Sequence, residues 1–358
     1  MEKVSIIVPV YNAAEYVGKC LESVALQDYK NIEIIVVEDG SDDESPDVCK
    51  EYARRYDNIK VYHDKCGTAG AARNYGMSKA DGDYVMFVDA DDYLTDNCVV
   101  SELTKKMENV VVGNYQRLWK NRLLDASKNS GFAGLDMNSV DFTFGGFFSI
   151  GTLSYAWAKL YRKSFLDSNK IEFGDYRYAE DKIYNYFCYI AGARYAFIDK
   201  KIYVYRRNEQ SVSNTYRKDG DKDWMRIAQD LQDKIDSLNY EKKQYSQDEI
   251  ENYESIVAWT IYFAAFFDGK MEYEYSTGKI SAVINLLKRY ASYDLTKKYL
   301  KNPLRYTKKI PALSYKIMLG GFAFLMKCNM YLLLSLGIKL LVDCHIDERL
   351  SDTGRKED

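Results

Sequence analysis

Short apolar runs alternate with amphipathic stretches through the first ninety residues of the chain. The apolar runs are rich in β-branched residues and are bounded by polar turns, which predicts strands at residues 4–10, 32–37, 59–62 and 84–88. The stretches between them have helical spacing, at residues 15–25, 45–56 and 68–78. This order predicts an α/β fold with a mainly parallel sheet and helices on both faces.

Polar clusters follow three of the four predicted strands. They are Tyr11-Asn12, Glu38-Asp39-Gly40 and Asp89-Ala90-Asp91-Asp92. Ligands of such sheets bind outside the carboxyl ends of the strands. We therefore expect the three clusters to converge on one edge of the sheet.

The cluster Asp89-Ala90-Asp91-Asp92 crowds three carboxylates into four residues. Like charges this close are unfavourable unless a cation neutralises them. Oxygen ligands at this density suit a hard divalent ion, Mg²⁺ or Mn²⁺, which keeps coordination positions open for a substrate phosphate. The alternative is an acidic turn that caps a following helix, since aspartate is a common cap residue.

The rest of the chain changes character twice. Residues 120–152 are rich in Gly, Ser, Asn and Phe, which predicts a long loop, and residues 154–205 resume mixed structure. From about residue 218 onward the pattern is that of long, charged helices. With a boundary near residues 214–220, the pattern predicts a catalytic domain over 1–215 and a helical region over 216–358.

The segment 313–342 is apolar but contains Lys316, Lys327 and Lys339, spaced so that they can share one helical face. Two interpretations stay open. The segment is either a helix that lies in a membrane interface or an amphipathic helix packed on the protein's own core. The internal lysines disfavour a helix that spans the membrane.

The composition disfavours several kinds of partner, metal site and cellular location. The net charge is −3, so nothing predicts a nucleic-acid partner. The seven cysteines form no Cys-x-x-Cys pair and are typical of reduced thiols, and two histidines are too few for a histidine-ligated zinc site. The run 4–8 is too short for a signal peptide, and no window of about 20 apolar residues lacks charge. We expect a cytoplasmic protein, peripheral at the inner face of the cell membrane.

Six segments in order resemble the inverting glycosyltransferases of family 2, enzymes with the GT-A fold that build bacterial surface polysaccharides. They are residues 5–12, 37–43, 70–74, 82–92, 157–161 and 180–181, within about residues 3–213. Two departures stand out. Glu38 occupies a position where the family usually has aspartate, although Asp39 keeps the carboxylate expected at the base. The stretch 67–74 lacks the usual serine, which can alter recognition of the phosphates slightly.

The resemblance implies that Asp181 is the catalytic base and that Glu180 lies on the acceptor side. It implies that Asp91 is the direct metal ligand and that Asp89 contacts the ribose, or the metal through water. Trp157 is implied on the acceptor side, where it can stack on a sugar. From the residues alone, a solvated helix start is the favoured interpretation of Glu180-Asp181, and only the resemblance reverses it. Trp157 is equally a core residue.

The residues expected to bind the nucleotide base lie in the loops after the first two predicted strands. Tyr11 can stack on a pyrimidine, and Asp39 can accept a hydrogen bond from N3–H of uracil, which favours a UDP-sugar donor. Arg73 can pair with the diphosphate, although a surface arginine is an equal alternative. The other positions that the resemblance assigns to the nucleotide-sugar are Pro9, Glu15 near the ribose, and Ala90.

Together these features predict a metal-dependent hexosyltransferase that inverts the anomeric centre and uses a UDP-sugar. The expected acceptor is a hydroxyl of a glycan or a lipid-linked saccharide. The alternatives are a catalytically inactive protein that binds sugar nucleotides and a sugar nucleotidyltransferase. The nucleotidyltransferase is disfavoured because the first strand ends in Pro9-Val10-Tyr11-Asn12 rather than in a glycine-rich phosphate loop. A dinucleotide-dependent dehydrogenase is disfavoured because no G-x-G-x-x-G follows that strand.

Overall fold

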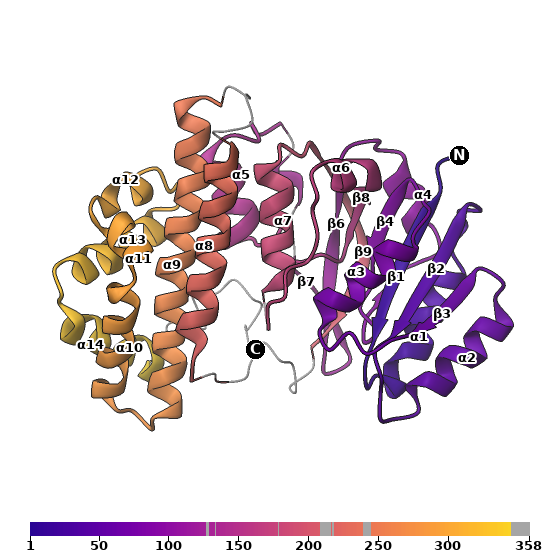
Figure 1. The fold of residues 1–358 in the computed structure, drawn as a ribbon, viewed down its shortest axis with the longest axis horizontal. Helices are drawn as coiled ribbons and strands as arrows, with labels where there is room; N and C mark the ends of the chain where they lie inside the picture. The colour runs from indigo at the N-terminus through magenta and orange to yellow at the C-terminus, as the bar shows by residue number, and fades with distance from the viewer. Residues whose placement is uncertain are drawn as a thin grey trace. The chain divides into compact units, whose positions relative to one another are not determined.

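The computed structural model describes residues 1–126, 129–132, 134–177, 179–207, 216, 218–238 and 245–344. The chain divides into two units (Figure 1). The first contains residues 1–135 and 150–211, and the second contains residues 136–149 and 212–358. Much of the expected boundary at 214–220 lies outside the described residues, and α8 begins at Gly220.

One half of the sheet in the first unit is parallel. The strands β3 (Ile59–His63), β2 (Ile32–Glu38), β1 (Val4–Val10) and β4 (Tyr84–Phe87) lie side by side in that order. All three pairings among them are parallel. Each strand agrees with its predicted range to within one residue. β1, β2 and β4 are buried on both faces, whereas the edge strand β3 buries Ile59 and exposes Lys60 and His63.

The other half of the sheet is mixed. Its strands follow β4 in the order β8 (Lys159–Arg162), β6 (Val110–Trp119), β9 (Tyr195–Arg206) and β5 (Tyr93–Leu94), with β7 (Arg122–Asp125) paired to β6. β8 is antiparallel to both β4 and β6, whereas β6 and β9 are parallel. The predicted α/β class is therefore confirmed, with antiparallel pairings added beyond β4.

Helices cover both faces of the parallel half (Figure 1). α1 (Ala14–Ala25) packs its apolar stripe into the core that includes Ile6 and Val8. α3 (Ala69–Lys79) lies on the opposite face, where Gly76 approaches Ile7. Alternate residues of a strand point to opposite faces, so these contacts assign the two helices to different layers. The remaining helices of the unit are α2 (Ser45–Arg55), α4 (Val99–Thr104), α6 (Lys163–Ser168) and α7 (Glu180–Ile190), with the short 3₁₀ helix η1 (Asn129–Phe132).

The described residues of the second unit are helical. The long helix α9 (Gln247–Tyr275) lies at its centre, and the ring of Trp259 meets Phe144 and Phe148 at centroid distances of 5.1 and 5.4 Å. Those two rings come from α5 (Val140–Phe144) and the π-helical turn η2 (Gly145–Ser149). The other helices are α8 (Gly220–Leu238), α10 (Ile280–Ser292), α11 (Asp294–Leu300), α12 (Pro303–Thr307), α13 (Leu313–Lys327) and α14 (Tyr331–Asp343).

Two expectations about these segments are wrong. The stretch 120–152 is not one loop, because it contains β7, η1, α5 and η2. The stretch 313–342 is not one helix, because α13 and α14 are separated at residues 328–330, where Asn329 has a left-handed φ of 58°. No helix in the described part of the chain is long and apolar enough to cross a membrane.

A glycine pair tests the packing of α3 on the sheet. A Cβ at Gly76 would lie 2.4 Å from Ile7 Cγ2, so we expect Gly76→Ala to lower the free energy of unfolding by about 1–3 kcal/mol through overpacking. Gly18, inside α1 of the same unit, has only ordinary contacts with Tyr52 at 3.5 Å or more. Gly18→Ala should therefore add about 0.5–1 kcal/mol through helix propensity. Urea unfolding followed by circular dichroism compares the two, and equal stabilities would contradict the proposed packing.

Candidate functional site

The loops after β1 and β2 are tied to each other. The backbone N–H of Asn12 donates to Ser41 Oγ at 3.1 Å, and the N–H of Asp42 donates to Asn12 Oδ1 at 2.9 Å. Asn12 takes a left-handed φ of 46°, which turns the chain sharply after the strand. The preceding side chain, Tyr11, is 59% exposed. Its ring is therefore accessible for stacking at the edge of the sheet.

Asp39 is fixed by backbone donors from a neighbouring loop. Its Oδ1 accepts from the N–H groups of Cys66 and Gly67, the latter at 3.0 Å. Its own N–H donates to the carbonyl of Val10, which joins it to the end of β1. Because these bonds use one carboxylate oxygen, Oδ2 is left to accept from a ligand.

Glu38, the residue that departs from the family pattern, is buried and has its own partners. It accepts from Ser41 N at 2.6 Å and from His63 Nδ1 at 3.1 Å. Burial acts to raise the pKa of Glu38, but these hydrogen bonds outweigh it and the pKa lies below its ordinary value. The sequence assigned no role to His63. The structure makes it the partner that accommodates glutamate at this position.

The three aspartates after β4 have different surroundings. Asp92 is completely buried and accepts from Tyr203 Oη at 2.8 Å and from Arg206 N at 2.7 Å. Burial raises its pKa well above the ordinary value. The short strand β5, not a helix, begins at the next residue, so the helix-cap alternative for this cluster is wrong. Asp92 instead joins the end of β4 to β9.

Asp91 is the least engaged of the three. Within the described chain no side chain donates a hydrogen bond to it, and burial, followed by the charge of Asp89, raises its pKa to about 6. Among the described residues no group of three or more histidine, cysteine, aspartate or glutamate side chains is arranged to hold a metal. One or two carboxylates completed by phosphate oxygens and water are nevertheless typical for Mg²⁺. Asp91 and Asp89 fit that kind of site.

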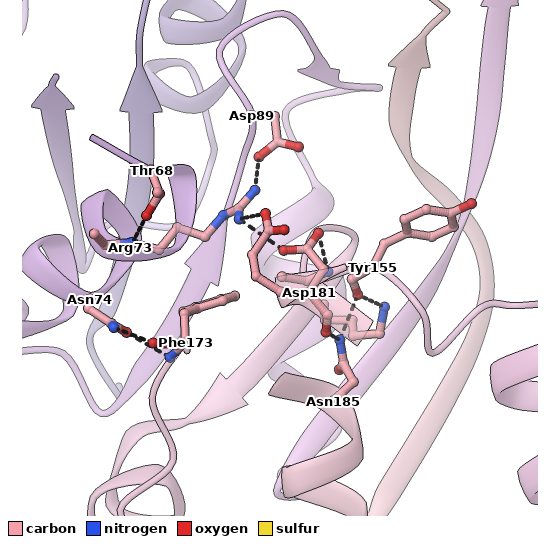
Figure 2. Close-up of polar contacts among 12 residues, drawn as sticks. Thr68, Arg73, Asn74, Asp89, Tyr155, Phe173, Asp181 and Asn185 are labelled. Atoms are coloured by element: carbon pink, nitrogen blue, oxygen red, sulfur yellow. Dashed lines mark hydrogen bonds and ion pairs between the residues drawn. The ribbon is translucent and has the colours of Figure 1, made fainter. Parts of the chain in front are cut away.

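Arg73 is the centre of the polar network (Figure 2). Its side chain is nearly fully buried and reaches three carboxylates from three parts of the chain. Nη2 donates to Asp89 Oδ1 at 2.8 Å, and Nη1 donates to Glu180 Oε1 at 3.0 Å. Nη1 also lies 2.9 Å from Asp181 Oδ1. The surface alternative for Arg73 is therefore wrong. One guanidinium joins the end of β4 to the start of α7.

The sequence around Arg73 explains how it is held. Thr68 caps α3 by accepting from Ala71 N at 3.2 Å. Asn74 forms a reciprocal pair with the backbone of Phe173, at 2.7 and 2.9 Å (Figure 2). A Cβ at Gly70 would lie 3.2 Å from Phe173 Cβ, so the missing side chain permits this close approach. The Gly-x-x-Arg-Asn segment thus fixes α3 against the segment that leads into α7.

Asp181 lies in the first turn of α7, which starts after Ala179 at a left-handed φ of 58°. Its Oδ2 accepts from Ala156 N at 3.1 Å. Its buried Oδ1 has no partner in hydrogen-bond geometry, although Arg73 is close. Burial raises the pKa of Asp181 to about 7, against the lowering effect of Arg73. This environment suits proton exchange near neutral pH.

Trp157 is a core residue, so the expected stacking on a sugar is not available to its ring. Tyr155 and Tyr203 lie parallel to it at centroid distances of 4.4 and 4.7 Å, with interplanar angles of 12° and 7°. Lys159, buried beneath this segment, donates to the carbonyls of Tyr155 and Trp157. Desolvation lowers the pKa of Lys159 to about 7. These stacking contacts and hydrogen bonds fix the loop that supplies Ala156 N to Asp181. The sequence did not indicate this role for the loop.

The structure therefore brings Arg73, Asp89, Glu180 and Asp181 into one network. Three other predicted residues lie in β1, in α1 and in the turn after β4. Pro9 is within β1, opposite Val37, and Ala90 is buried. Glu15 is exposed in the first turn of α1.

Comparison with known proteins identifies the family of the N-terminal part of the chain. The model of the family "Glycosyl transferase family 2" matches residues 5–150. This part of the chain belongs to glycosyl transferase family 2. The likeness to this family is confirmed, and four of the six segments, 5–12, 37–43, 70–74 and 82–92, lie within the matched residues.

Relatives by sequence and by structure extend the comparison. "Glycosyltransferase GlyA" of Streptococcus pneumoniae is 31% identical over 225 residues, which are 60% of this chain and 32% of that protein. "Poly(ribitol-phosphate) beta-glucosyltransferase" of Bacillus spizizenii is 27% identical over 226 residues, which are 60% of this chain and 34% of that protein. The chain thus spans about a third of the length of each.

Residues 1–349 of TarS from S. aureus, solved with UDP-GlcNAc, superpose with a TM-score of 0.67. The superposition covers 94% of this chain and 92% of that one at 20% identity. It confirms the expected GT-A fold followed by a helical region.

Removing the charge of Arg73 tests the network in this family 2 domain. Arg73→Gln leaves three carboxylates without their cation, so we expect a loss of about 3–5 kcal/mol in the free energy of unfolding at pH 8. Burial already raises the pKa of Asp181, and loss of the lowering effect of Arg73 raises it further, so Asp181 of the variant takes up a proton as the pH falls. The loss should therefore shrink toward pH 5.5. Urea titrations at both pH values measure it, with exposed Arg54→Gln as the control; a loss independent of pH would contradict this charge network.

Proposed function

We propose that the protein transfers a sugar from a UDP-sugar to a hydroxyl group of a saccharide acceptor, with inversion at the anomeric carbon. One observation carries the proposal. The buried carboxylate of Asp181 shares the guanidinium of Arg73 with Asp89, at the end of the strand that leads to Asp91. The network joins a candidate proton acceptor to carboxylates that would hold a divalent cation, and that cation would neutralise the departing diphosphate.

The choice of a uridine nucleotide rests on the loops after β1 and β2. Tyr11 offers an exposed ring for stacking, and Asp39 is held so that one oxygen remains to accept from N3–H. Uracil carries a hydrogen at N3 and cytosine does not. That TarS was solved with UDP-GlcNAc is in keeping with this choice. Glu15, Pro9 and Ala90 complete the proposed nucleotide side.

A divalent cation fits the acidic end of the site. Asp91 would hold Mn²⁺ or Mg²⁺, and Asp89 would support it directly or through water. When bound, the cation supplies neutralisation of the charge that develops on the diphosphate. Burial, followed by the charge of Asp89, raises the pKa of Asp91, and a cation bound there would favour its ionised form.

The chain's own residues then perform the transfer. The acceptor oxygen forms a bond to the anomeric carbon as the bond from that carbon to the diphosphate breaks, and the hydroxyl proton passes to Asp181. Ala156 N and Arg73 hold the carboxylate in place for this step. Displacement in a single step leaves no covalent intermediate on the enzyme and inverts the centre. Glu180 lies beside the base, on the proposed acceptor side.

We further propose that the acceptor belongs to a cell-surface polysaccharide or its lipid-linked precursor. One relative, from Bacillus spizizenii, is a poly(ribitol-phosphate) beta-glucosyltransferase, which supports a surface polymer as the acceptor class.

Asp181→Asn tests the base, because it keeps the shape of the side chain and removes proton acceptance. We expect kcat to fall by about 10²–10⁴-fold while UDP still binds. In the native enzyme, kcat/KM should rise as the pH passes through about 7, because Asp181 acts in its deprotonated form. Proton NMR of the product should show the inverted anomer. A retained anomer, or near-normal turnover of the variant, would overturn the mechanism.

Asp91→Asn tests the metal site. Removal of one charge should reduce Mn²⁺ affinity in the presence of UDP by more than about 100-fold, the upper limit for residues that merely support a ligand. Calorimetry and electron paramagnetic resonance measure this without recourse to activity. Exposed Asp47→Asn, on α2, is the matched control. Undiminished Mn²⁺ binding, or full native activity in excess chelator, would refute the assignment.

A further inference from the structure

The outer faces of α13 and α14 expose large apolar side chains. Eight such residues, each at least 44% exposed, form what we call the apolar stripe: Leu313, Ile317, Phe324, Met330, Leu332, Leu333, Leu336 and Leu340. Single exposed leucines are ordinary on protein surfaces, but a run of eight within 28 residues is a patch. Patches of this kind mark surfaces that contact another apolar phase.

Helical spacing assigns the stripe to one side of each helix. On α13 the exposed positions 313, 317 and 324 are separated by four and seven residues. On α14 the exposed positions 332, 336 and 340 are separated by four. The opposite faces are buried in the second unit: Phe322 contacts Phe266 of α9, and Ile338 packs beside Gly269 of the same helix. Both helices therefore turn their apolar stripes away from α9.

The segment that carries the stripe is rich in basic residues, of which Lys297, Arg305, Lys309 and Lys339 form ion pairs with carboxylates. Residues 295–342 contain nine lysines and arginines and no aspartate or glutamate, in a chain whose net charge is −3. Lys327 Nζ donates to the carbonyl of Lys301 at 2.8 Å, which joins the end of α13 to the end of α11. This bond places the backbone of Lys301 beside Lys327, at the end of the helix that carries part of the stripe.

We propose that the apolar stripe and the basic residues of its segment bind the surface of an anionic phospholipid bilayer, with α13 and α14 lying in the interface. Apolar side chains enter the boundary between headgroups and acyl chains while lysines meet the phosphates. The 15 residues of α13 and 13 of α14 correspond to about 22 and about 20 Å, short of the roughly 30 Å of a bilayer core. The helices thus lie on the membrane rather than through it.

A second copy of the chain fits this surface less well. A two-fold contact places the same patch of both molecules face to face. The basic residues of one copy would then meet those of the other, and like charges repel. An anionic bilayer satisfies the apolar and the basic parts of the surface together.

Vesicle co-sedimentation of the full chain tests the proposal. We expect binding to vesicles with a large share of phosphatidylglycerol at low salt, with much weaker binding to pure phosphatidylcholine or at high salt. The variant Ile317→Ser/Leu332→Ser/Leu336→Ser should lose at least about tenfold in partitioning. Its control, Leu26→Ser/Met107→Ser/Leu123→Ser, changes residues of similar exposure in the first unit and should bind as the native chain does.

A charge variant keeps the test decisive if the serine variant fails to fold. Lys298→Gln/Lys301→Gln/Lys308→Gln changes exposed lysines only and should weaken binding by about a hundredfold, or about fivefold per lysine. Lys30→Gln/Lys50→Gln/Lys60→Gln is its control in the first unit.

Several outcomes would overturn the proposal. They are failure of the native chain to bind anionic vesicles at low salt, equal binding to neutral vesicles, and equal losses in test and control variants. A native dimer by light scattering that becomes a monomer in the serine variant, without vesicle binding, would assign the stripe to self-association instead. These results are independent of the proposed transferase activity, since vesicle binding is measured without donor or acceptor.

Discussion

The candidate site depends on the buried guanidinium of Arg73 and the three carboxylates that surround it. A buried arginine and a buried aspartate would each be unfavourable alone, and their mutual contact makes both tolerable. Three carboxylates against one cation do not balance, however. The excess negative charge, together with burial, explains why the pKa of Asp181 rises to about 7 even though Arg73 lies 2.9 Å away. A proton or a further cation completes the balance, and both are what group transfer at a diphosphate requires.

The parallel half of the sheet could be predicted because short stretches of sequence are enough to indicate its strands and turns. Apolar residues dominate β1, β2 and β4, and a turn rich in polar residues follows each of these strands. The convergence of Tyr11, Asp39 and Asp89 then follows from strand topology alone. The mixed half depends on pairings between distant segments, such as β6 with β9, and on strands whose side chains include many tyrosines and charges. The sequence pattern therefore predicted a long loop over residues 120–152, which in fact contain β7 and several short helices.

The same distinction separates the site residues. The aspartates after β4 form a cluster that is visible in the local sequence, whereas two partners of Arg73 lie 16 and 107 residues away from it in the chain. A single arginine on a predicted helix carries no sign of such partners. Trp157 shows the opposite error: an aromatic residue in a recognisable motif suggested a ligand contact. Its ring is instead stacked with those of Tyr155 and Tyr203, which only the folded chain brings there.

In the second unit, α13 and α14 are apolar on both sides, which a helix packed on a core does not require. Their inner faces include Phe322 and Ile338 and supply packing against α9, so deleting these helices would expose the core and change many properties at once. Their outer faces contribute nothing to that packing. Apolar side chains exposed to water give no stability and favour aggregation, and the basic residues beside them oppose contact with a second copy. An anionic bilayer, which is apolar inside and negatively charged at its surface, accounts for both properties. Substitutions confined to the outer faces separate membrane binding from folding.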